Sequence, residues 1–150
     1  MNNIISFKTK FGWINASEKN CFILSISFGK KKNQGSSKTL INLKNQIKNY
    51  FLGKNINYKF KIQLNGTKLQ KKIWKQLQKI PYGETRSYKE IAKIVNTSPR
   101  YVGNVCGQNK HILIIPCHRV IRSDGSLGGF SAPGGIKLKH KLLLFEKESL

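Results

Sequence analysis

The spacing of apolar residues differs between the two parts of the chain, and this difference limits the fold more than any other feature. In residues 1–65 most apolar positions alternate or run together with β-branched and aromatic residues, which is typical of strands. In residues 66–150 they recur at intervals of three and four, which is typical of amphipathic helices. The sequence therefore predicts an α+β protein: an N-terminal α+β domain and a mostly helical C-terminal domain.

The N-terminal part, residues 1–65, is predicted to be a small α/β unit with a short antiparallel sheet. Residues 4–14 and 21–28 are predicted strands, and the polar stretch NASEKN at 15–20 is the predicted turn between them. Residues 37–52 place apolar side chains on one face of a helix, and residues 57–64 alternate again as a strand. None of these segments has the residue spacing of a catalytic site.

A pair of short helices is predicted within residues 87–108. Ser87 precedes an apolar run and has Glu90 three residues later, the pattern of a capping box. After a short turn, Ser98 followed by Pro99 is typical of the start of another helix. Two short helices joined this tightly indicate a helix-turn-helix, a motif of DNA-binding proteins.

Further helices are predicted on both sides of this pair, at residues 67–80 and 136–145. Between the pair and the last helix lies SDGSLGGFSAPGG, a loop with five glycines. The loop has no GxGxxG or GxxxxGK[ST] spacing, which argues against a nucleotide-phosphate site. Its glycines indicate tight turns and a close approach of backbone to another group.

The net charge is strongly positive: 28 Lys and Arg against 6 Asp and Glu give +22. Such a charge favours a polyanionic partner, most simply nucleic acid. However, residues 1–65 carry 12 basic and 1 acidic residue and residues 66–150 carry 16 and 5, so each part is +11. A compositional bias toward lysine would give the same even spread, and both interpretations stay open. The arginines, in contrast, all lie close to one another: Arg86, Arg100, Arg119 and Arg122.

The sequence also indicates the cellular compartment in which the protein is expected. It has no apolar run of 18 or more residues, so a membrane association is not expected. The N-terminus lacks the pattern of a secretory signal peptide. Three widely separated cysteines are typical of reduced thiols rather than of a disulfide framework. We therefore expect a cytoplasmic protein.

A cysteine, a histidine and an arginine follow one another in the apolar stretch IIPCHRVI at residues 114–121. Cys117 could be a small buried apolar residue, which is the common fate of a single cysteine. Zinc binding is not favoured, because adjacent side chains do not easily ligate one ion and no C-x₂-C or H-x₃-H spacing exists. The alternative is a nucleophile that His118 reaches through a water molecule, with Glu146 behind the imidazole to fix its tautomer.

The segment PCHRV at 116–120 resembles the signature of the O6-alkylguanine-DNA alkyltransferases, the methylated-DNA–protein-cysteine methyltransferases. The resemblance extends over about residues 73–146 and includes PYGETRSYKEIA, PRYVGN, the glycine-rich loop and LLLFE. It implies a winged-helix-like second domain, residues 66–150, that carries a helix-turn-helix and an active-site cysteine. The implied partner is double-stranded DNA that contains O6-alkylguanine.

The resemblance further implies that the damaged base is rotated out of the duplex and gives its alkyl group irreversibly to the protein. Cys117 would be the nucleophile and alkyl acceptor, and His118, held by Glu146, would remove the thiol proton through water. Tyr88 would crowd the target phosphate and protonate the departing guanine, and Asn109 would tie the preceding turn to the active site. The damaged base is itself the alkyl donor, so no cofactor is expected, and we expect a monomer.

The resemblance also implies positions on DNA and around the base. Arg100 would fill the gap that the rotated base leaves in the stack. Other residues expected on the DNA-binding surface are Ser87, Tyr88, Ser98 and Tyr101. Residues expected around the guanine are Pro116, Val120, Phe130 and Ser131. Arg119 would brace the fold through buried polar contacts.

Some positions depart from the family pattern. Lys110 stands where many members have proline, and Phe130 replaces a tyrosine of some relatives. No Cys/His set matches the zinc site of some members, so no metal is expected.

Two other functions stay possible: an alkyltransferase-like lesion sensor, although such proteins replace the acceptor cysteine, and a helix-turn-helix regulator with a structural cysteine. The range of alkyl groups and activity on O4-methylthymine are left open.

Overall fold

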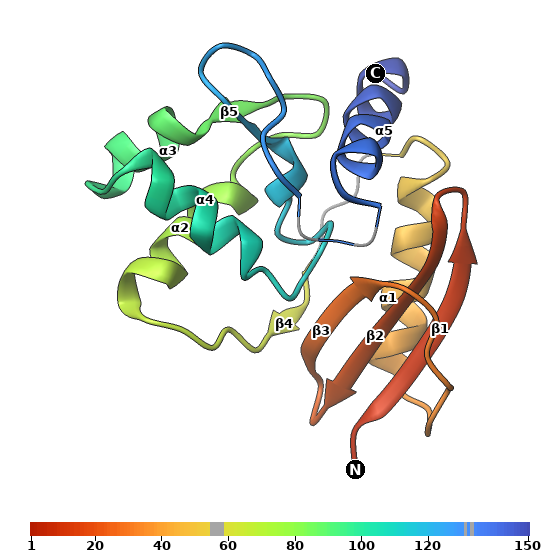
Figure 1. The fold of residues 1–150 in the computed structure, drawn as a ribbon. Coiled ribbons are helices and arrows are strands. Elements are labelled where there is room, and N and C mark those ends of the chain that lie inside the picture. The colour runs from red at the N-terminus through yellow and green to blue at the C-terminus, as the bar shows by residue number, and fades with distance from the viewer. Residues whose placement is uncertain (55–58, 131, 133) are drawn as a thin grey trace. The chain divides into compact units, whose positions relative to one another are not determined.

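The computed structural model describes residues 1–54, 59–130, 132 and 134–150 and divides into two compact units (Figure 1). The first unit comprises Met1–Leu64 and the second Asn65–Leu150. A sheet with one helix characterises the first unit, and helices predominate in the second. The predicted α+β class is therefore confirmed.

In its described residues, the first unit is a sheet of four strands with one helix packed against it. In chain order its elements are β1 (Asn3–Thr9), β2 (Gly12–Lys19), β3 (Phe22–Phe28), α1 (Lys38–Tyr50) and β4 (Lys61–Ile62). The first three strands are antiparallel neighbours, whereas β4 pairs with β3 in parallel, so the sheet is mixed rather than purely antiparallel. The helix contacts β1 and β2 and begins where the Ser37 hydroxyl accepts a hydrogen bond from the Leu40 amide.

The predicted turn at residues 15–20 is wrong, because most of that stretch is β2. Its polar side chains have partners within the sheet: the Asn15 amide group donates to the Gly29 carbonyl (2.9 Å), and Glu18 accepts from the Asn3 side chain (3.0 Å). The chain turns instead between Thr9 and Gly12 and at Asn20–Cys21. Asn20 and Cys21 both have positive φ, 53° and 69°, as a two-residue hairpin turn requires.

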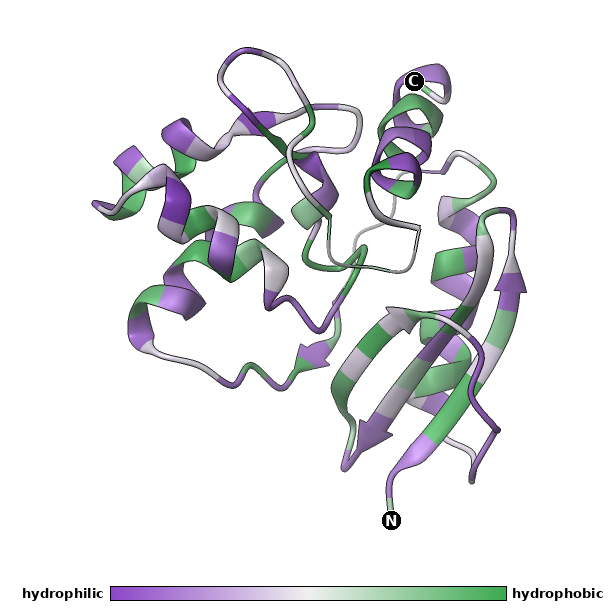
Figure 2. Cartoon of the chain, in the orientation of Figure 1, coloured by the Kyte–Doolittle hydropathy of each residue, from purple (hydrophilic) through white to green (hydrophobic). Residues whose placement is uncertain are grey.

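Figure 2 shows the alternation of apolar and polar residues along these strands. The predicted strand 57–64 is only partly found. Its described part contains β4, Lys61–Ile62, while residues 57 and 58 lie outside the described residues. Within the described ranges, no helix of the chain has the length and apolar character needed to cross a membrane.

The second unit contains the predicted helices and an unpredicted strand pair. Its elements are α2 (Lys68–Gln78), β5 (Arg86–Ser87), α3 (Tyr88–Val95), α4 (Pro99–Gly107), a 3₁₀ turn (Cys117–Arg119), β6 (Val120–Ile121) and α5 (Gly135–Glu148). Helices α3 and α4 pack against each other and against α2, and Trp74 of α2 donates to the Val105 carbonyl (3.2 Å). The predicted helix pair is confirmed.

Hydrogen-bonded caps fix both helices of this pair. The Ser87 hydroxyl accepts from the Glu90 amide (3.0 Å) and the Ser98 hydroxyl from the Tyr101 amide (3.1 Å). Asn96 ends α3 in the left-handed conformation (φ 59°), which lets the chain turn directly into α4. The tight turn therefore follows from side chains that are visible in the sequence.

The pair β5–β6 joins two segments that lie far apart in the sequence. Arg86 pairs with Val120 and Ser87 with Ile121, in parallel. Because α3 begins directly after β5 and the 3₁₀ turn ends directly before β6, the pairing brings the start of α3 beside the Cys117 segment. This contact positions the candidate site.

Candidate active site

Cys117 is the first residue of the 3₁₀ turn, and its side chain is buried with 5% exposed. Its amide donates to the Ile115 carbonyl (2.8 Å), so the chain is tightly turned at this point. The Asn109 side chain donates to the thiol Sγ (3.2 Å) and to the Ile115 carbonyl (2.8 Å). Asn109 thus ties the turn before the motif to the thiol.

His118 points away from solvent and bonds to Glu146 on α5. The distance between His118 Nε2 and Glu146 Oε2 is 2.6 Å, and both side chains are 1% exposed. Burial lowers the pKa of His118, although Glu146 acts to raise it, so the ring is neutral near pH 7. An ionised carboxylate can only accept, so Nε2 carries the hydrogen and Nδ1 keeps a free lone pair. His118 can therefore accept a proton.

Glu146 is also held by Arg119. Arg119 Nε donates to Oε1 (2.8 Å) and Nη2 to Oε2 (3.1 Å), while Nη1 donates to the Ile80 carbonyl (2.9 Å). The Gly83 amide donates to Oε1 (3.2 Å). Burial acts to raise the pKa of Glu146, but the His118 and Arg119 partners outweigh it and lower the pKa to about 2. The carboxylate is therefore ionised, and Arg119 braces it.

The thiol itself is not ionised in the free protein. Burial raises the pKa of Cys117, against the opposing effects of the Asn109 hydrogen bond and the Lys139 charge. The site therefore holds Cys117 as a neutral thiol and not as a thiolate. A base must remove the proton when the thiol reacts, which is a task that His118 can perform.

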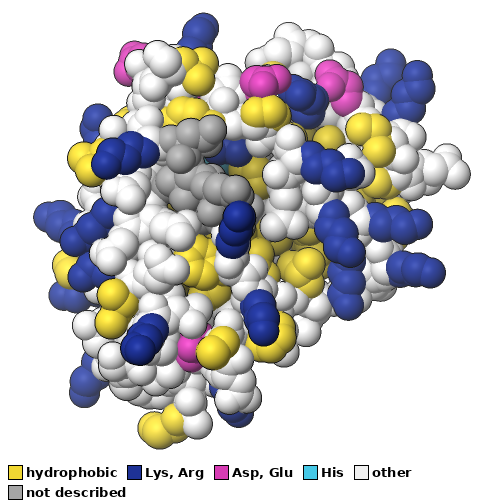
Figure 3. Space-filling model, turned by 180° about the vertical axis from the view of Figure 1, so that it is seen from behind, with side chains coloured by type: hydrophobic (Ala, Val, Ile, Leu, Met, Phe, Trp, Pro, Cys, Tyr) yellow, Lys and Arg dark blue, Asp and Glu magenta, His cyan; other side chains and the backbone are white. Residues whose placement is uncertain are grey.

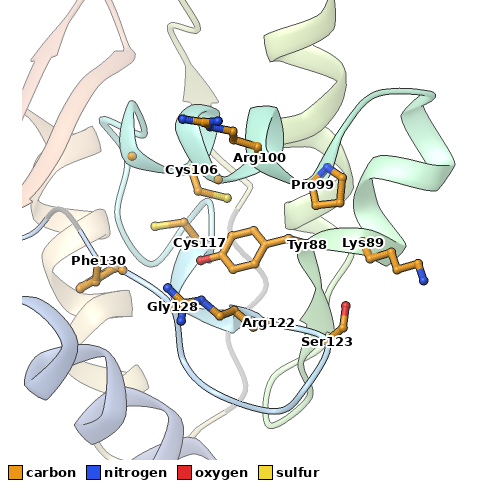
Figure 4. A pocket seen from close by; sticks show the side chains of 13 residues that line it. Tyr88, Lys89, Pro99, Arg100, Cys106, Cys117, Arg122, Ser123, Gly128 and Phe130 are labelled. Carbon is orange, nitrogen blue, oxygen red and sulfur yellow. The ribbon is translucent and has the colours of Figure 1, made fainter.

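A cavity of about 740 Å³ opens above the thiol (Figure 4). Tyr88 and Arg100 both line it, from the first turns of α3 and α4. The remaining lining residues are Lys89, Pro99, Gly103, Cys106, Gly107, Cys117, Arg122, Ser123, Gly128, Gly129 and Phe130. Figure 4 shows the Tyr88 hydroxyl and the Cys117 side chain in the same part of this space. The helix pair and the cysteine thus share one cavity.

Lys139 is a site residue that the sequence analysis missed. It lies on α5 with no exposed surface, and its Nζ donates to Tyr88 Oη (3.2 Å), the Leu127 carbonyl (2.5 Å) and the Gly129 carbonyl (3.3 Å). Burial lowers its pKa to about 8. The signal in the sequence is its position, three residues before Leu142 and seven before Glu146, on the buried face of the helix.

The glycine-rich loop touches Tyr88 closely. Gly128 has φ +72°, and a Cβ atom at this position would lie 3.0 Å from Tyr88 Oη. Only glycine fits such an approach without moving the tyrosine. Burial also raises the pKa of Tyr88 to about 12, so its hydroxyl keeps its proton. Lys139 and the loop together hold a protonated tyrosine at the cavity.

The other predicted positions divide into three groups. Ser87 and Ser98 use their hydroxyls as helix caps, and Tyr101 is half-buried on the first turn of α4. Phe130 lines the cavity, whereas Pro116 and Val120 are buried and are not among its described lining residues. Ser131 lies outside the described residues. The predicted contacts of these residues with DNA and guanine stay predictions.

On the face drawn in Figure 3, lysines and arginines are spread widely rather than gathered in one patch. This agrees with the even division of charge along the sequence. No group of three or more histidine, cysteine or acidic side chains in the described part of the chain is arranged to bind a metal ion.

The fold and the site together define a protein in which a helix-turn-helix pair and a buried thiol line one cavity, with a buried histidine–glutamate pair next to the thiol in the chain. The sequence model of the domain described as 6-O-methylguanine DNA methyltransferase, DNA binding domain, matches residues 68–148. This match covers more than half of the chain. The chain therefore belongs to the 6-O-methylguanine DNA methyltransferase family.

Individual relatives agree with this assignment. The methylated-DNA–protein-cysteine methyltransferase of Methanosarcina barkeri is 45% identical over 107 residues, which are 70% of this chain and 66% of that protein. The protein of the same name from Metallosphaera sedula is 35% identical over 144 residues, 94% of this chain and 90% of its own length.

Solved structures of the family resemble the chain as well. The crystal structure of Mycobacterium tuberculosis O6-methylguanine methyltransferase matches 100% of this chain and 95% of its own, with a TM-score of 0.87 and 30% identity. The crystal structure of Mycobacterium tuberculosis OGT in complex with DNA matches 97% and 93%, with a TM-score of 0.85 and 31% identity.

Proposed function

We propose that this chain repairs double-stranded DNA by transferring the alkyl group of O6-alkylguanine irreversibly to its own Cys117. The observation that carries the proposal is the Cys117 thiol at a cavity lined by the first turns of both helices of the helix-turn-helix, with the His118–Glu146 pair beside it. Family membership supports the same reaction, since the relatives are named for methyl transfer to a protein cysteine.

The reaction is a single displacement. The Cys117 sulfur attacks the alkyl carbon, a carbon–sulfur bond forms, and the bond from that carbon to O6 breaks. The thiol proton passes through water to His118 Nδ1, and the departing guanine takes a proton from the Tyr88 hydroxyl. The product is a thioether, which has no leaving group that water displaces readily, so each molecule reacts once. The damaged base supplies the alkyl group, and no cofactor takes part.

Lys139 positions the proton donor. The Tyr88 oxygen accepts a hydrogen bond from the Lys139 ammonium, so the tyrosine's own hydrogen points elsewhere and can be given to a base in the cavity that Tyr88 lines. The same ammonium lies next to the tyrosinate that forms when Tyr88 gives up its proton, and it stabilises that negative charge.

The DNA-binding part of the proposal rests on α3 and α4. An O6-alkyl group inside a duplex is not accessible to a buried thiol, so the nucleotide must rotate out, at a cost of roughly a few kcal/mol. Arg100 is exposed in the first turn of α4 and lines the cavity, where its guanidinium can take the place of the missing base. We further propose that the protein acts as a monomer in the cytoplasm.

Mass spectrometry of the intact protein tests the proposal. After incubation with a duplex containing O6-methylguanine, the protein should gain the mass of one methyl group in place of a hydrogen, and peptide mapping should locate it on Cys117. Cys117→Ser should gain nothing and still bind the duplex, because the thiol reacts rather than docks. A methyl group found elsewhere, or tight binding without transfer by the unaltered protein, would refute the function.

Arg100→Ala should separate base rotation from chemistry. Transfer from duplex DNA should slow about tenfold or more, equivalent to ~1.4 kcal/mol, because the extrahelical state loses its support. Transfer from free O6-benzylguanine needs no rotation and should stay nearly constant. Arg100→Lys should restore little of the rate on duplex DNA, since an ammonium neither stacks nor forms paired hydrogen bonds as a planar guanidinium does. Equal losses on both substrates would contradict this role for Arg100.

A further inference from the structure

A second thiol lies in the cavity of the proposed acceptor. Cys106 is on α4 between Gly103 and Gly107, and all three line the cavity. The Cys106 residue is 8% exposed, and Figure 4 shows its side chain extending from α4 toward the part of the cavity that holds Cys117 and Tyr88. Burial raises the pKa of Cys106 to about 12.

The reaction proposed above does not use Cys106. Its thiol stays protonated near pH 7, and the hydrogen bond from Asn109 goes to Cys117. The first alkyl group should therefore go to Cys117 alone. After that transfer, an unmodified thiol remains in the same cavity as the new thioether.

We propose, on the basis of the proposed function, that Cys106 is a second acceptor, which captures the far end of a two-carbon electrophile whose near end Cys117 has already taken. The substrate class is a haloethyl group, which carries a leaving group on the carbon beyond the one that is transferred. The final product is a protein in which an ethylene bridge joins the two sulfur atoms.

The chemistry of this second step balances without an oxidant or reductant. Cys117 first carries a 2-haloethyl thioether. Its sulfur displaces the halide from the far carbon and forms a three-membered cyclic sulfonium ion. The Cys106 sulfur then attacks a ring carbon, the bond from that carbon to the positive sulfur breaks, and the thiol proton passes to water. Two neutral thioethers, one halide and one proton result.

The buried position of Cys106 in the cavity that Cys117 also lines favours this step over its competitors. Water and DNA nucleophiles also open a cyclic sulfonium ion, but a thiol held in the same cavity acts at a high effective concentration. A disulfide would require sulfur atoms about 2 Å apart, whereas an ethylene bridge spans a wider separation and makes weaker demands on geometry. Capture by Cys106 would keep the reactive ion from linking the protein to DNA.

The test uses 1,2-dibromoethane, which has a leaving group at each end of a two-carbon chain. Cys21 is exposed and would react too, so all proteins carry Cys21→Ser. Trypsin cleaves after Arg100, Lys110 and Arg119, which separates peptide 101–110 with Cys106 from peptide 111–119 with Cys117. Mass spectrometry should find these peptides joined by a bridge in most molecules alkylated at Cys117.

The matched variant with Cys106→Ser should instead carry a hydroxyethyl group on Cys117, from water, and no joined peptides. The result is the fraction of Cys117-alkylated molecules that carry the bridge, so a change in the rate of alkylation does not affect it. Hydroxyethyl-Cys117 beside an unmodified Cys106 in most molecules, or no product of 1,2-dibromoethane on Cys117, would overturn the proposal. Methyl transfer from an O6-methylguanine duplex, measured in parallel, reports on the proposed function separately.

Discussion

Glu146→Ala is expected to lower the free energy of unfolding by about 3–5 kcal/mol, because it leaves the buried Arg119 guanidinium without its partner. Glu146 accepts hydrogen bonds from Arg119, from the Gly83 amide and from His118, and its side chain is buried. Chemical denaturation near pH 7 measures the loss. Because the substitution also frees the His118 ring, methyl transfer should fall together with stability.

Glu148→Ala is the matched control for this change. Glu148 lies on the same helix but is exposed, so its removal should change stability by less than about 0.5 kcal/mol. A loss below about 1 kcal/mol for Glu146→Ala would show that the carboxylate is not the centre of a buried network.

The contribution of Glu146 should also depend on pH with a definite sign. The pKa of Glu146 in the fold is about 2, below its ordinary value of 4.5. The folded state thus favours the ionised form, so the stabilisation is complete above about pH 4.5 and is lost as the pH falls toward 2. The difference in stability between the unaltered protein and Glu146→Ala should therefore shrink over this acid range.

Lys139→Met is expected to slow methyl transfer from a duplex about 100-fold, a loss of ~2.7 kcal/mol in transition-state stabilisation. The change removes three hydrogen bonds, those to Tyr88 Oη and to the carbonyls of Leu127 and Gly129. Tyr88 then loses the contact that directs its hydrogen and the charge that stabilises its anion. Single-turnover kinetics measures the rate.

Lys137→Met removes the same charge from an exposed position of α5 and is the matched control. It should leave the rate within about twofold.

The pH dependence of methyl transfer tests whether Lys139 must be charged. Its pKa is lowered to about 8, so transfer by the unaltered protein should decline as the pH rises through about 8, and Lys139→Met should lack this decline. A normal rate in Lys139→Met with the decline retained would refute both roles.

This pH profile depends on the groups around the ammonium. Tyr88 of α3, Cys106 of α4, Cys117 of the 3₁₀ turn and Arg122 after β6 all face Lys139 or act on it electrostatically. Both thiols gain charge only at high pH, where they would retain the proton on Lys139. If Cys106→Ser shows the same decline of transfer with rising pH as the unaltered protein, the titrating group is Lys139 and not Cys106.

The helices of the second unit could be predicted because their signals are local. Ser87, Ser98 and Pro99 mark helix starts by their own chemistry, and an apolar face is visible within one segment. The strands of the first unit were harder to predict. Asn15 and Glu18 indicated a turn by their polarity, but partners on other segments, among them Gly29 and Asn3, stabilise them inside a sheet.

In the candidate site, too, local features could be predicted from the sequence, whereas features that depend on distant segments could not. The adjacent Cys117, His118 and Arg119 were visible as a motif, but their directions follow from the 3₁₀ turn, and Tyr88 reaches the cavity through the β5–β6 pair. Lys139 was missed because lysine is common throughout this chain, which made one lysine on a helix unremarkable. Its burial depends on acceptors supplied by a distant loop.

The most direct measurement of the central claim is the number of methyl groups transferred per protein molecule. A duplex with O6-methylguanine is supplied in large molar excess, and methyl transfer is followed until it stops. The account predicts a plateau at about one methyl group per molecule, with all of it on Cys117, because the thioether does not release its methyl group. Continued turnover beyond one methyl group per molecule, or a plateau reached without modified Cys117, would contradict the account.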